Sequence, residues 1–305
     1  MRHSHDNDHA GHSHGVTADT STGRLAVALG LIAAFMAAEV VAGILVHSLA
    51  LLSDAAHMLT DAGAIGLSLL ALRLAARPAA GAMTFGLRRA EILSAQANGG
   101  TLLVLAALIL YEAVHRLVSP PVVSGWTVTI VALAGVAVNL LATWQLAKAN
   151  RANMAVEGSF QHILTDLYAF TGTAIAGVVI VATGFHRADP IASLVVAALM
   201  VRAAYGLLKN SGRVLLEMAP EQLDVKEIGE ALAAHPHVAS VHDLHVWEIG
   251  SGFPSLSAHV LVHKGDDCHA IRMELERLLR DRFGIDHTTL QVDHEQPNLL
   301  QIADH

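Results

Sequence analysis

The stretch that decides the fold is Ser53–Asp61, SDAAHMLTD, which lies inside an apolar run and carries His57 and Asp61 four residues apart. On a helix, residues at this spacing share one face. The segment from His162 to Asp166, HILTD, repeats the HMLTD of the first motif with one substitution inside a second apolar run. Ionisable groups cost several kcal/mol each at membrane depth. Their repetition therefore indicates a functional site between two helices.

The composition is that of a polytopic membrane protein. Hydrophobic residues make up 53% of the 305 residues and charged residues 15%, with a mean hydropathy of +0.47, whereas globular chains average about 25% charged residues. The net charge of −8 argues against a nucleic-acid partner. Cys268 is the only cysteine, so we expect no disulfide framework and a soluble part that faces a reducing cytosol. Residues 1–23 lack the apolar core of a secretory signal, and the first hydrophobic segment is expected to remain as a span.

Six apolar runs, each near the ~20 residues that cross a bilayer, predict six membrane helices. Lys and Arg gather in the loops on one side of these runs, against Arg116 and Arg187 on the other, which predicts that both termini face the cytosol. We expect a multi-pass protein of the inner (plasma) membrane. The runs cover residues 25–46, 51–74, 92–114, 126–147, 162–183 and 190–208.

In this topology the second and fifth spans run in opposite directions. The two HxxxD motifs are then antiparallel, so Asp61 should lie level with His162, and His57 level with Asp166. Two imidazoles and two carboxylates are four ligands of the kind that suits tetrahedral Zn²⁺. Two aspartates would also neutralise a divalent cation in a medium where isolated charge is costly. The sequence therefore predicts a metal site made of His57, Asp61, His162 and Asp166.

From about residue 210 the chain is soluble in character. Helices at 223–235 and 267–283 and strands at 238–249, 256–262 and 288–292 are expected, in the order αββαβ, as a small sheet with helices on one face. The open face or the edge strands favour dimerisation. The region is dense in histidine, more than a solvated surface explains, and this indicates metal binding. Its histidines are His235, His237, His242, His245, His259, His263, His269, His287 and His294.

These features together resemble the cation diffusion facilitator family of metal exporters, in its bacterial zinc-exporter form. The matching motifs are HxxxD in the second and fifth spans, FGLRRAE at 85–91, HDLHVW at 242–247 and TLQVD at 289–293. They occur in the family's order and cover residues 24–295. The domains expected are a disordered His-rich cytoplasmic tail (1–23), a six-helix transport domain (24–209), a cytoplasmic metal-binding dimerisation domain (210–295) and a C-terminal tail (296–305).

The resemblance implies a homodimer that exchanges cytosolic Zn²⁺, and often Cd²⁺, for protons; Co²⁺ and Ni²⁺ are further candidate substrates. It implies no catalytic residue and no prosthetic group, because zinc is the substrate and a regulatory ligand. It places transport at the two HxxxD motifs and suggests a charge pair between Arg89 and Glu217. The cytoplasmic domain resembles a ferredoxin-like metallochaperone with zinc near the dimer interface, although Gln291 stands where some members have histidine. The matching positions there are His242, His259, His269, His287 and Asp293.

Two other functions are compatible with a metal site inside a membrane. An intramembrane zinc enzyme would have three protein ligands plus water and often the glutamate of HExxH, which neither motif contains. A metal-gated channel would conduct without coupling to a proton gradient. A sensor that uses its spans only as an anchor does not explain motifs repeated at membrane depth.

Overall fold

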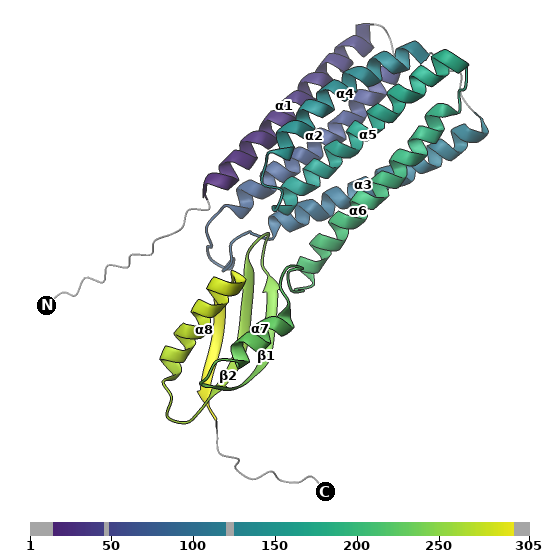
Figure 1. Cartoon of the computed structure of the whole chain (residues 1–305). Coiled ribbons are helices and arrows are strands. Elements are labelled where there is room, and N and C mark those ends of the chain that lie inside the picture. Colours follow the sequence, from purple (N-terminus) through teal and green to yellow (C-terminus); the bar gives the residue numbers. More distant parts are fainter. Residues whose placement is uncertain (1–14, 46–48, 120–124, 296–305) are drawn as a thin grey trace, which may run out of the picture.

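The computed structural model describes residues 15–45, 49–119 and 125–295. These form a bundle of long helices, α1 to α6, and a smaller domain that extends from one end of the bundle (Figure 1). The long helices are α1 (Gly15–Leu45), α2 (Leu49–Ala75), α3 (Ala90–Val118), α4 (Gly125–Ala147), α5 (Met154–Thr183) and α6 (Ala188–Leu215).

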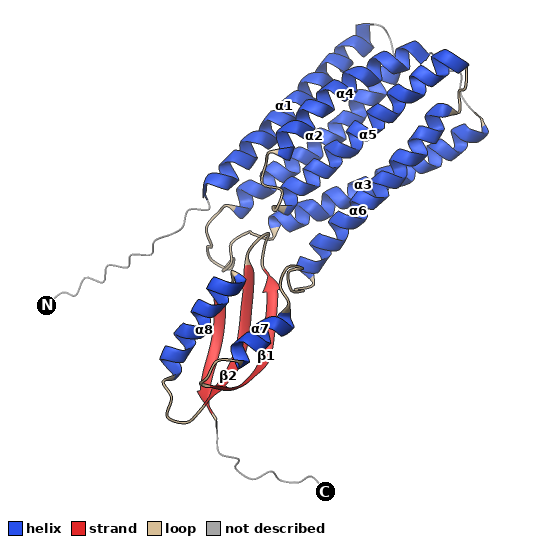
Figure 2. Cartoon of the chain, viewed as in Figure 1, coloured by secondary structure: helices blue, strands red, loops and turns tan. Residues whose placement is uncertain are grey.

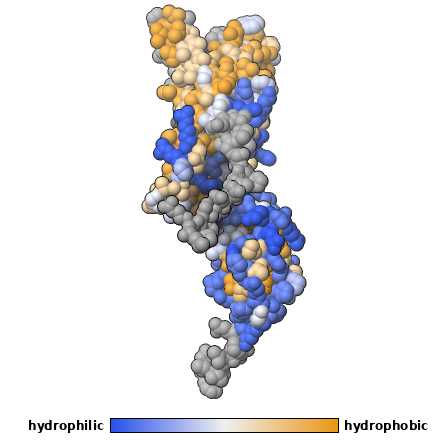
Figure 3. All heavy atoms as spheres, turned by 90° about the vertical axis from the view of Figure 1, so that its left-hand side faces the viewer, coloured by the Kyte–Doolittle hydropathy of each residue, from blue (hydrophilic) through white to orange (hydrophobic). Residues whose placement is uncertain are grey.

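All six helices contain a segment that is long and apolar enough to cross a membrane. The prediction of six spans is thus confirmed. Large apolar side chains such as Tyr111, Val118 and Tyr205 are exposed on the bundle. Figure 3 shows hydrophobic residues gathered on the bundle and hydrophilic residues on the smaller domain. This distribution is expected where lipid surrounds the first and water the second.

Two helices, α1 and α5, begin well before the apolar runs predict. α5 begins at Met154 because the Asn153 side chain caps it, accepting hydrogen bonds from the backbone N–H groups of Ala155 (3.0 Å) and Val156 (3.4 Å). α1 begins at Gly15, inside the stretch expected to be a disordered tail. Its polar part is tied to the bundle at Ser21, whose hydroxyl accepts a hydrogen bond from the backbone N–H of Asn150 at 3.1 Å. Residues 1–14 and 296–305 lie outside the described part of the chain.

The bundle has two groups of helices. One apolar core joins α1, α2, α4 and α5, with Ile32, Met58, Leu146 and Ile163 among its buried members. A second core joins α3 to α6 through residues such as Leu102. Figure 1 shows the α3–α6 pair diverging from the other four helices with distance from the smaller domain. The two groups thus have separate apolar cores, although α3 and α6 also contact α5.

The smaller domain has the predicted αββαβ order (Figure 2). Its sheet has the order β1-β2-β3, with β1 antiparallel and β3 parallel to the central strand. Leu256, Ala258, Val260 and Val262 of β2 alternate into a core covered by α7 and α8, which leaves the other face of the sheet open. The elements are α7 (Val225–Ala233), β1 (Val238–Glu248), β2 (Pro254–Val262), α8 (Cys268–Phe283) and β3 (His287–His294).

Candidate metal centre

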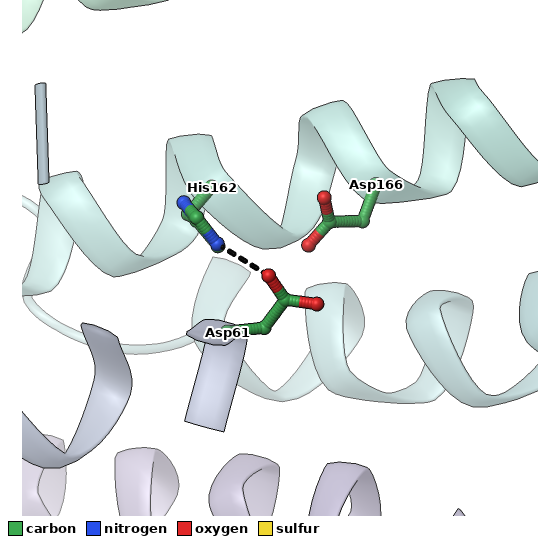
Figure 4. A group of neighbouring side chains, drawn as sticks. All are labelled: Asp61, His162 and Asp166. Carbon is green, nitrogen blue, oxygen red and sulfur yellow. Dashed lines mark hydrogen bonds and ion pairs between the residues drawn. The ribbon is translucent and has the colours of Figure 1, made fainter. Parts of the chain in front are cut away.

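Three ionisable side chains meet between α2 and α5. Asp61 comes from α2, and His162 and Asp166 come from α5; Figure 4 shows the three pointing toward one another. Asp61 Oδ1 lies 2.8 Å from His162 Nε2. One ligand atom from each residue lies within 4.8 Å of those of the other two, and all three residues are buried, with exposed fractions of 4%, 0% and 7%. The arrangement concentrates carboxylate and imidazole ligands at one point in an apolar bundle.

The local sequence explains this geometry. His162 and Asp166 are one turn apart on α5, and Asp61 lies level with His162, as the antiparallel arrangement of the two motifs predicts. The threonine inside the second motif is satisfied within its own helix, because Thr165 Oγ1 donates to the carbonyl oxygens of His162 (2.7 Å) and Gln161 (3.1 Å). Thr165 therefore does not compete for the aspartates. His162 Nδ1 has no hydrogen-bond partner within the described residues.

The spacing of one pair in the cluster, Asp61 and His162, is close to what a zinc ion requires. Tetrahedral zinc holds nitrogen and oxygen ligands at about 2.0–2.2 Å, which places two neighbouring ligand atoms about 3.3 Å apart. The 2.8 Å between Asp61 Oδ1 and His162 Nε2 is a hydrogen-bond distance. Separating the two atoms by about 0.5 Å would allow an ion to replace the proton between them. The separations that suit a shared proton and a bound ion at this pair therefore differ by only about 0.5 Å.

The predicted fourth ligand is His57. It belongs to α2, but its side chain lies outside the described residues, as does that of Asp54. Its role as a ligand stays a prediction.

A cavity of about 310 Å³ lies between α5 and α6 on a neighbouring face of α5. Gln161, Thr165 and Arg202 line it, whereas His162 and Asp166 do not. The cavity thus adjoins the motif through Gln161 and Thr165 and not through the ligand side chains.

The metal ligands predicted in the smaller domain are only partly brought together. His242 and His259 are cross-strand partners with ring centroids 5.3 Å apart. Asp243 Oδ2 lies 3.9 Å from His259 Nδ1, with Asp243 at a φ of 50°. The register of β1 against β2 shifts between His242 and His245, and this irregularity brings Asp243 close to His259. Sequence patterns did not single out Asp243 as a ligand, because strict alternation places it on the opposite face from His242.

The other three candidates lie apart from this pair. His269 comes from α8, which covers the opposite face of the sheet. Asp293 Oδ2 accepts a hydrogen bond from Gln291 at 2.8 Å. His287 packs between Phe85 (5.7 Å between ring centroids) and Phe253 (5.6 Å). Within one chain, the structure joins His242 to His259 and does not place His269 beside them.

Comparison with known proteins identifies the class. Residues 25–216 match the family model described as "Cation efflux transmembrane domain", and residues 220–295 match "Cation efflux protein, cytoplasmic domain". The chain is a multi-pass membrane transporter and not an enzyme. It belongs to the cation efflux family, the cation diffusion facilitators, as its motifs predicted.

Full-length relatives support the same assignment. The chain is 36% identical over 296 residues to the "Cadmium, cobalt and zinc/H(+)-K(+) antiporter" of Bacillus subtilis, covering 94% of this chain and 93% of the relative. It is 38% identical over 291 residues to "Zinc transporter ZitB" of Escherichia coli, covering 93% of each chain. A solved structure, the "Metal-bound C-terminal domain of the CzcD transporter from Cuprividus metallidurans", is 37% identical over 23% of this chain and 97% of its own, with a TM-score of 0.22.

Proposed function

We propose that the protein is a proton-coupled antiporter that exports Zn²⁺, and with it Cd²⁺, from the cytosol. His57, Asp61, His162 and Asp166 form the transport site, and Co²⁺ and Ni²⁺ are further candidate substrates. The observation that carries this proposal is the buried cluster of Asp61, His162 and Asp166 between two membrane helices. The names of the relatives, which include zinc transporters and a cadmium, cobalt and zinc antiporter, support the substrate class.

Competition between metal and proton at the histidines is the basis of the coupling. An imidazole binds metal only when it is neutral, so protonation of His57 or His162 releases the ion. Asp61 and Asp166 supply the negative charge that makes a divalent cation tolerable in an apolar bundle. The ion enters while the site faces the cytosol, the two helix groups move against each other, and protons from the other side displace the metal.

The charge distribution supports the orientation. Lys and Arg concentrate on the side of the bundle that bears the smaller domain, and the family model describes that domain as cytoplasmic. We assign both termini to the cytosol and the protein to the plasma membrane.

The cytoplasmic domain is assigned a regulatory zinc site and a dimer contact. His242, His259 and Asp243 offer a first set of ligands on the open face of the sheet. His287 and Asp293 belong to β3, the neighbour of β2 in the same sheet. His269 would join this set only from a second copy of the chain, because it lies on the opposite side of the sheet. A site that is completed across two copies would couple zinc concentration to dimer geometry.

Zinc uptake into inverted membrane vesicles, with and without an imposed pH gradient, tests the function. We expect uptake that is accelerated by protons inside the vesicles and abolished by Asp166→Ala. Uptake indifferent to the pH gradient would favour the metal-gated channel, and uptake by Asp166→Ala at the wild-type rate would remove the site.

A further inference from the structure

A buried carboxylate lies where the two domains meet. Glu91, in the first turn of α3, is 6% exposed. Its Oε1 accepts a hydrogen bond from the backbone N–H of Ser251 at 2.7 Å, and its Oε2 accepts one from Asn153 Nδ2. Ser251 belongs to the turn between β1 and β2 of the cytoplasmic domain. One side chain therefore joins three segments that are distant in sequence.

The same turn also holds the start of α5 directly. Ser251 Oγ accepts a hydrogen bond from the backbone N–H of Met154 at 3.0 Å, while the Asn153 side chain accepts those of Ala155 and Val156. The first three N–H groups of α5 have no partner inside the helix, and here all three are satisfied by Asn153 and Ser251. The position of the helix start is thus set by the cytoplasmic domain and by Glu91 together.

The face of α3 that begins at Glu91 also forms hydrogen bonds with α2, the helix that carries the first HxxxD motif. Ser94 and Asn98 continue this face of α3. Asn98 Nδ2 donates to Ser68 Oγ of α2 at 3.1 Å, and the hydroxyls of Ser68 and Ser94 are 3.2 Å apart. All three side chains are buried. Hydrogen bonds to one face of α3 therefore help to position both α2, which carries Asp61, and α5, which carries His162.

Among the residues that the structure describes, no arginine forms an ion pair with Glu91. Arg88 packs over the ring of Phe253, 4.1 Å from its centroid, and Arg89 pairs with Glu217 at 3.0 Å. The carboxylate instead lies at the N-terminal ends of two helices, α3 and α5, where the helix dipoles favour negative charge. A hydrogen-bonded anion in that place holds two helix ends together more tightly than a neutral amide would.

We propose that Glu91 is a positioning residue of the transport site, which fixes the start of α5 against the β1–β2 turn of the cytoplasmic domain. His162 is eight residues into α5, roughly 12 Å along a continuous helix, so a shift of the helix start reaches the ligand cluster. The distance between Asp61 Oδ1 and His162 Nε2 that suits a shared proton is about 0.5 Å shorter than the distance that suits a bound metal. The inference rests on the proposed transport function.

The junction also connects to a predicted regulatory ligand. Phe253, in the same turn as Ser251, contacts the ring of His287 at a centroid distance of 5.6 Å. A movement of His287 on metal binding in the cytoplasmic domain would therefore displace the turn that holds α5. Glu91 then lies on the route by which cytosolic zinc alters the transport site.

A reversal of the hydrogen bond between positions 91 and 153 tests the proposal. Asn153→Asp keeps a good helix cap but places a carboxylate against Glu91. Glu91→Gln places an amide donor against the Asn153 amide. In the double variant, Gln at position 91 donates to Asp at position 153 and still accepts from Ser251. Asn150→Asp is the matched control, because Asn150 lies in the same loop, is exposed, and uses its side-chain oxygen to accept from the backbone N–H of Ala152 at 3.2 Å, a bond that aspartate keeps.

The readout is zinc transport by the full-length protein in proteoliposomes, measured as maximal rate and half-saturating zinc concentration, with assembly checked by gel filtration. We expect each single variant to lower the maximal rate roughly tenfold, the order expected when a buried hydrogen bond to a charged group is lost. The double variant should return to within about twofold of wild type, and Asn150→Asp should match wild type.

Two results would overturn the inference. One is a wild-type rate in Asn153→Asp, and the other is a double variant that stays as slow as the single variants, whether or not it assembles. Asp61→Ala, measured in parallel, separates this outcome from a failure of the proposed function: transport by that variant at the wild-type rate removes the transport site itself, whereas an inactive Asp61→Ala with an unaffected Asn153→Asp removes only the role of Glu91.

Discussion

Replacing Asp61 by asparagine removes one negative charge from the cluster while preserving side-chain shape. Asp61 Oδ1 is 2.8 Å from His162 Nε2, and the two side chains are 6% and 0% exposed. When the ion binds, this hydrogen bond is replaced by a contact between the Asp61 carboxylate and the metal. If that contact is worth as much as a buried hydrogen bond to a charged group, about 1.5–3 kcal/mol, its loss corresponds to about 10-fold to 150-fold in affinity, and the uncompensated charge of the ion adds to this. We therefore expect the half-saturating zinc concentration to rise at least roughly 100-fold.

The assay is zinc entry into proteoliposomes that contain a zinc-sensitive fluorescent dye, recorded over a range of zinc concentrations. Asp189→Asn is the matched control, because Asp189 is a half-buried carboxylate of α6 that lies 3.9 Å from Arg116 and outside the cluster. It should transport as the wild type does. A half-saturating concentration for Asp61→Asn within threefold of wild type would refute the reasoning that this carboxylate binds the ion.

Four further outcomes are expected. His57→Asp should broaden transport toward harder ions such as Mn²⁺, because it exchanges a nitrogen ligand for oxygen; an unchanged metal profile in competition assays would contradict this. Arg89→Glu should slow transport, and adding Glu217→Arg should partly restore it, because the double variant again places opposite charges at the 3.0 Å pair. The pair is half exposed and contributes only about 0–1 kcal/mol, so the fold should survive either change; a double variant no faster than the single one would count against the pair. His259→Ala should weaken activation at low zinc and leave transport at saturating zinc largely intact, and complete loss at every concentration would exclude a regulatory role. Burial raises the pKa of Glu248 above 4.5, so its contribution to stability is present at low pH and is lost as pH rises through the folded-state pKa. Glu248→Gln should therefore raise the thermal unfolding midpoint at pH 8 more than at pH 5. Equal shifts at the two pH values would contradict the raised pKa.

Much of the architecture follows from local patterns in the sequence. Hydropathy predicted the six spans, and strand alternation with turn residues predicted the αββαβ order, because both depend on short-range periodicity. The meeting of Asp61 with His162 was predictable because a repeated motif on antiparallel helices has few ways to align. The pairing of Arg89 with Glu217, suggested by family resemblance, is present at 3.0 Å.

Features that depend on long-range contacts were not predictable in the same way. The early start of α5 depends on Asn153, whose amide both caps the helix and bonds to Glu91. The docking of Ser251 on Glu91 joins segments with no common pattern in the sequence. Asp243 reaches His259 only because β1 is irregular after His242, and periodicity gives no sign of such an irregularity.

The most direct test of proton-coupled export is to record proton and zinc movement in the same proteoliposomes. Zinc is added outside in the absence of a pH gradient, while entrapped dyes report zinc and pH inside. The account predicts that zinc entry is accompanied by an outward flow of protons and a rise of internal pH in the wild type, and that both signals are nearly absent in Asp61→Asn at the zinc concentration that half-saturates the wild type. Zinc entry with no change of internal pH would contradict it.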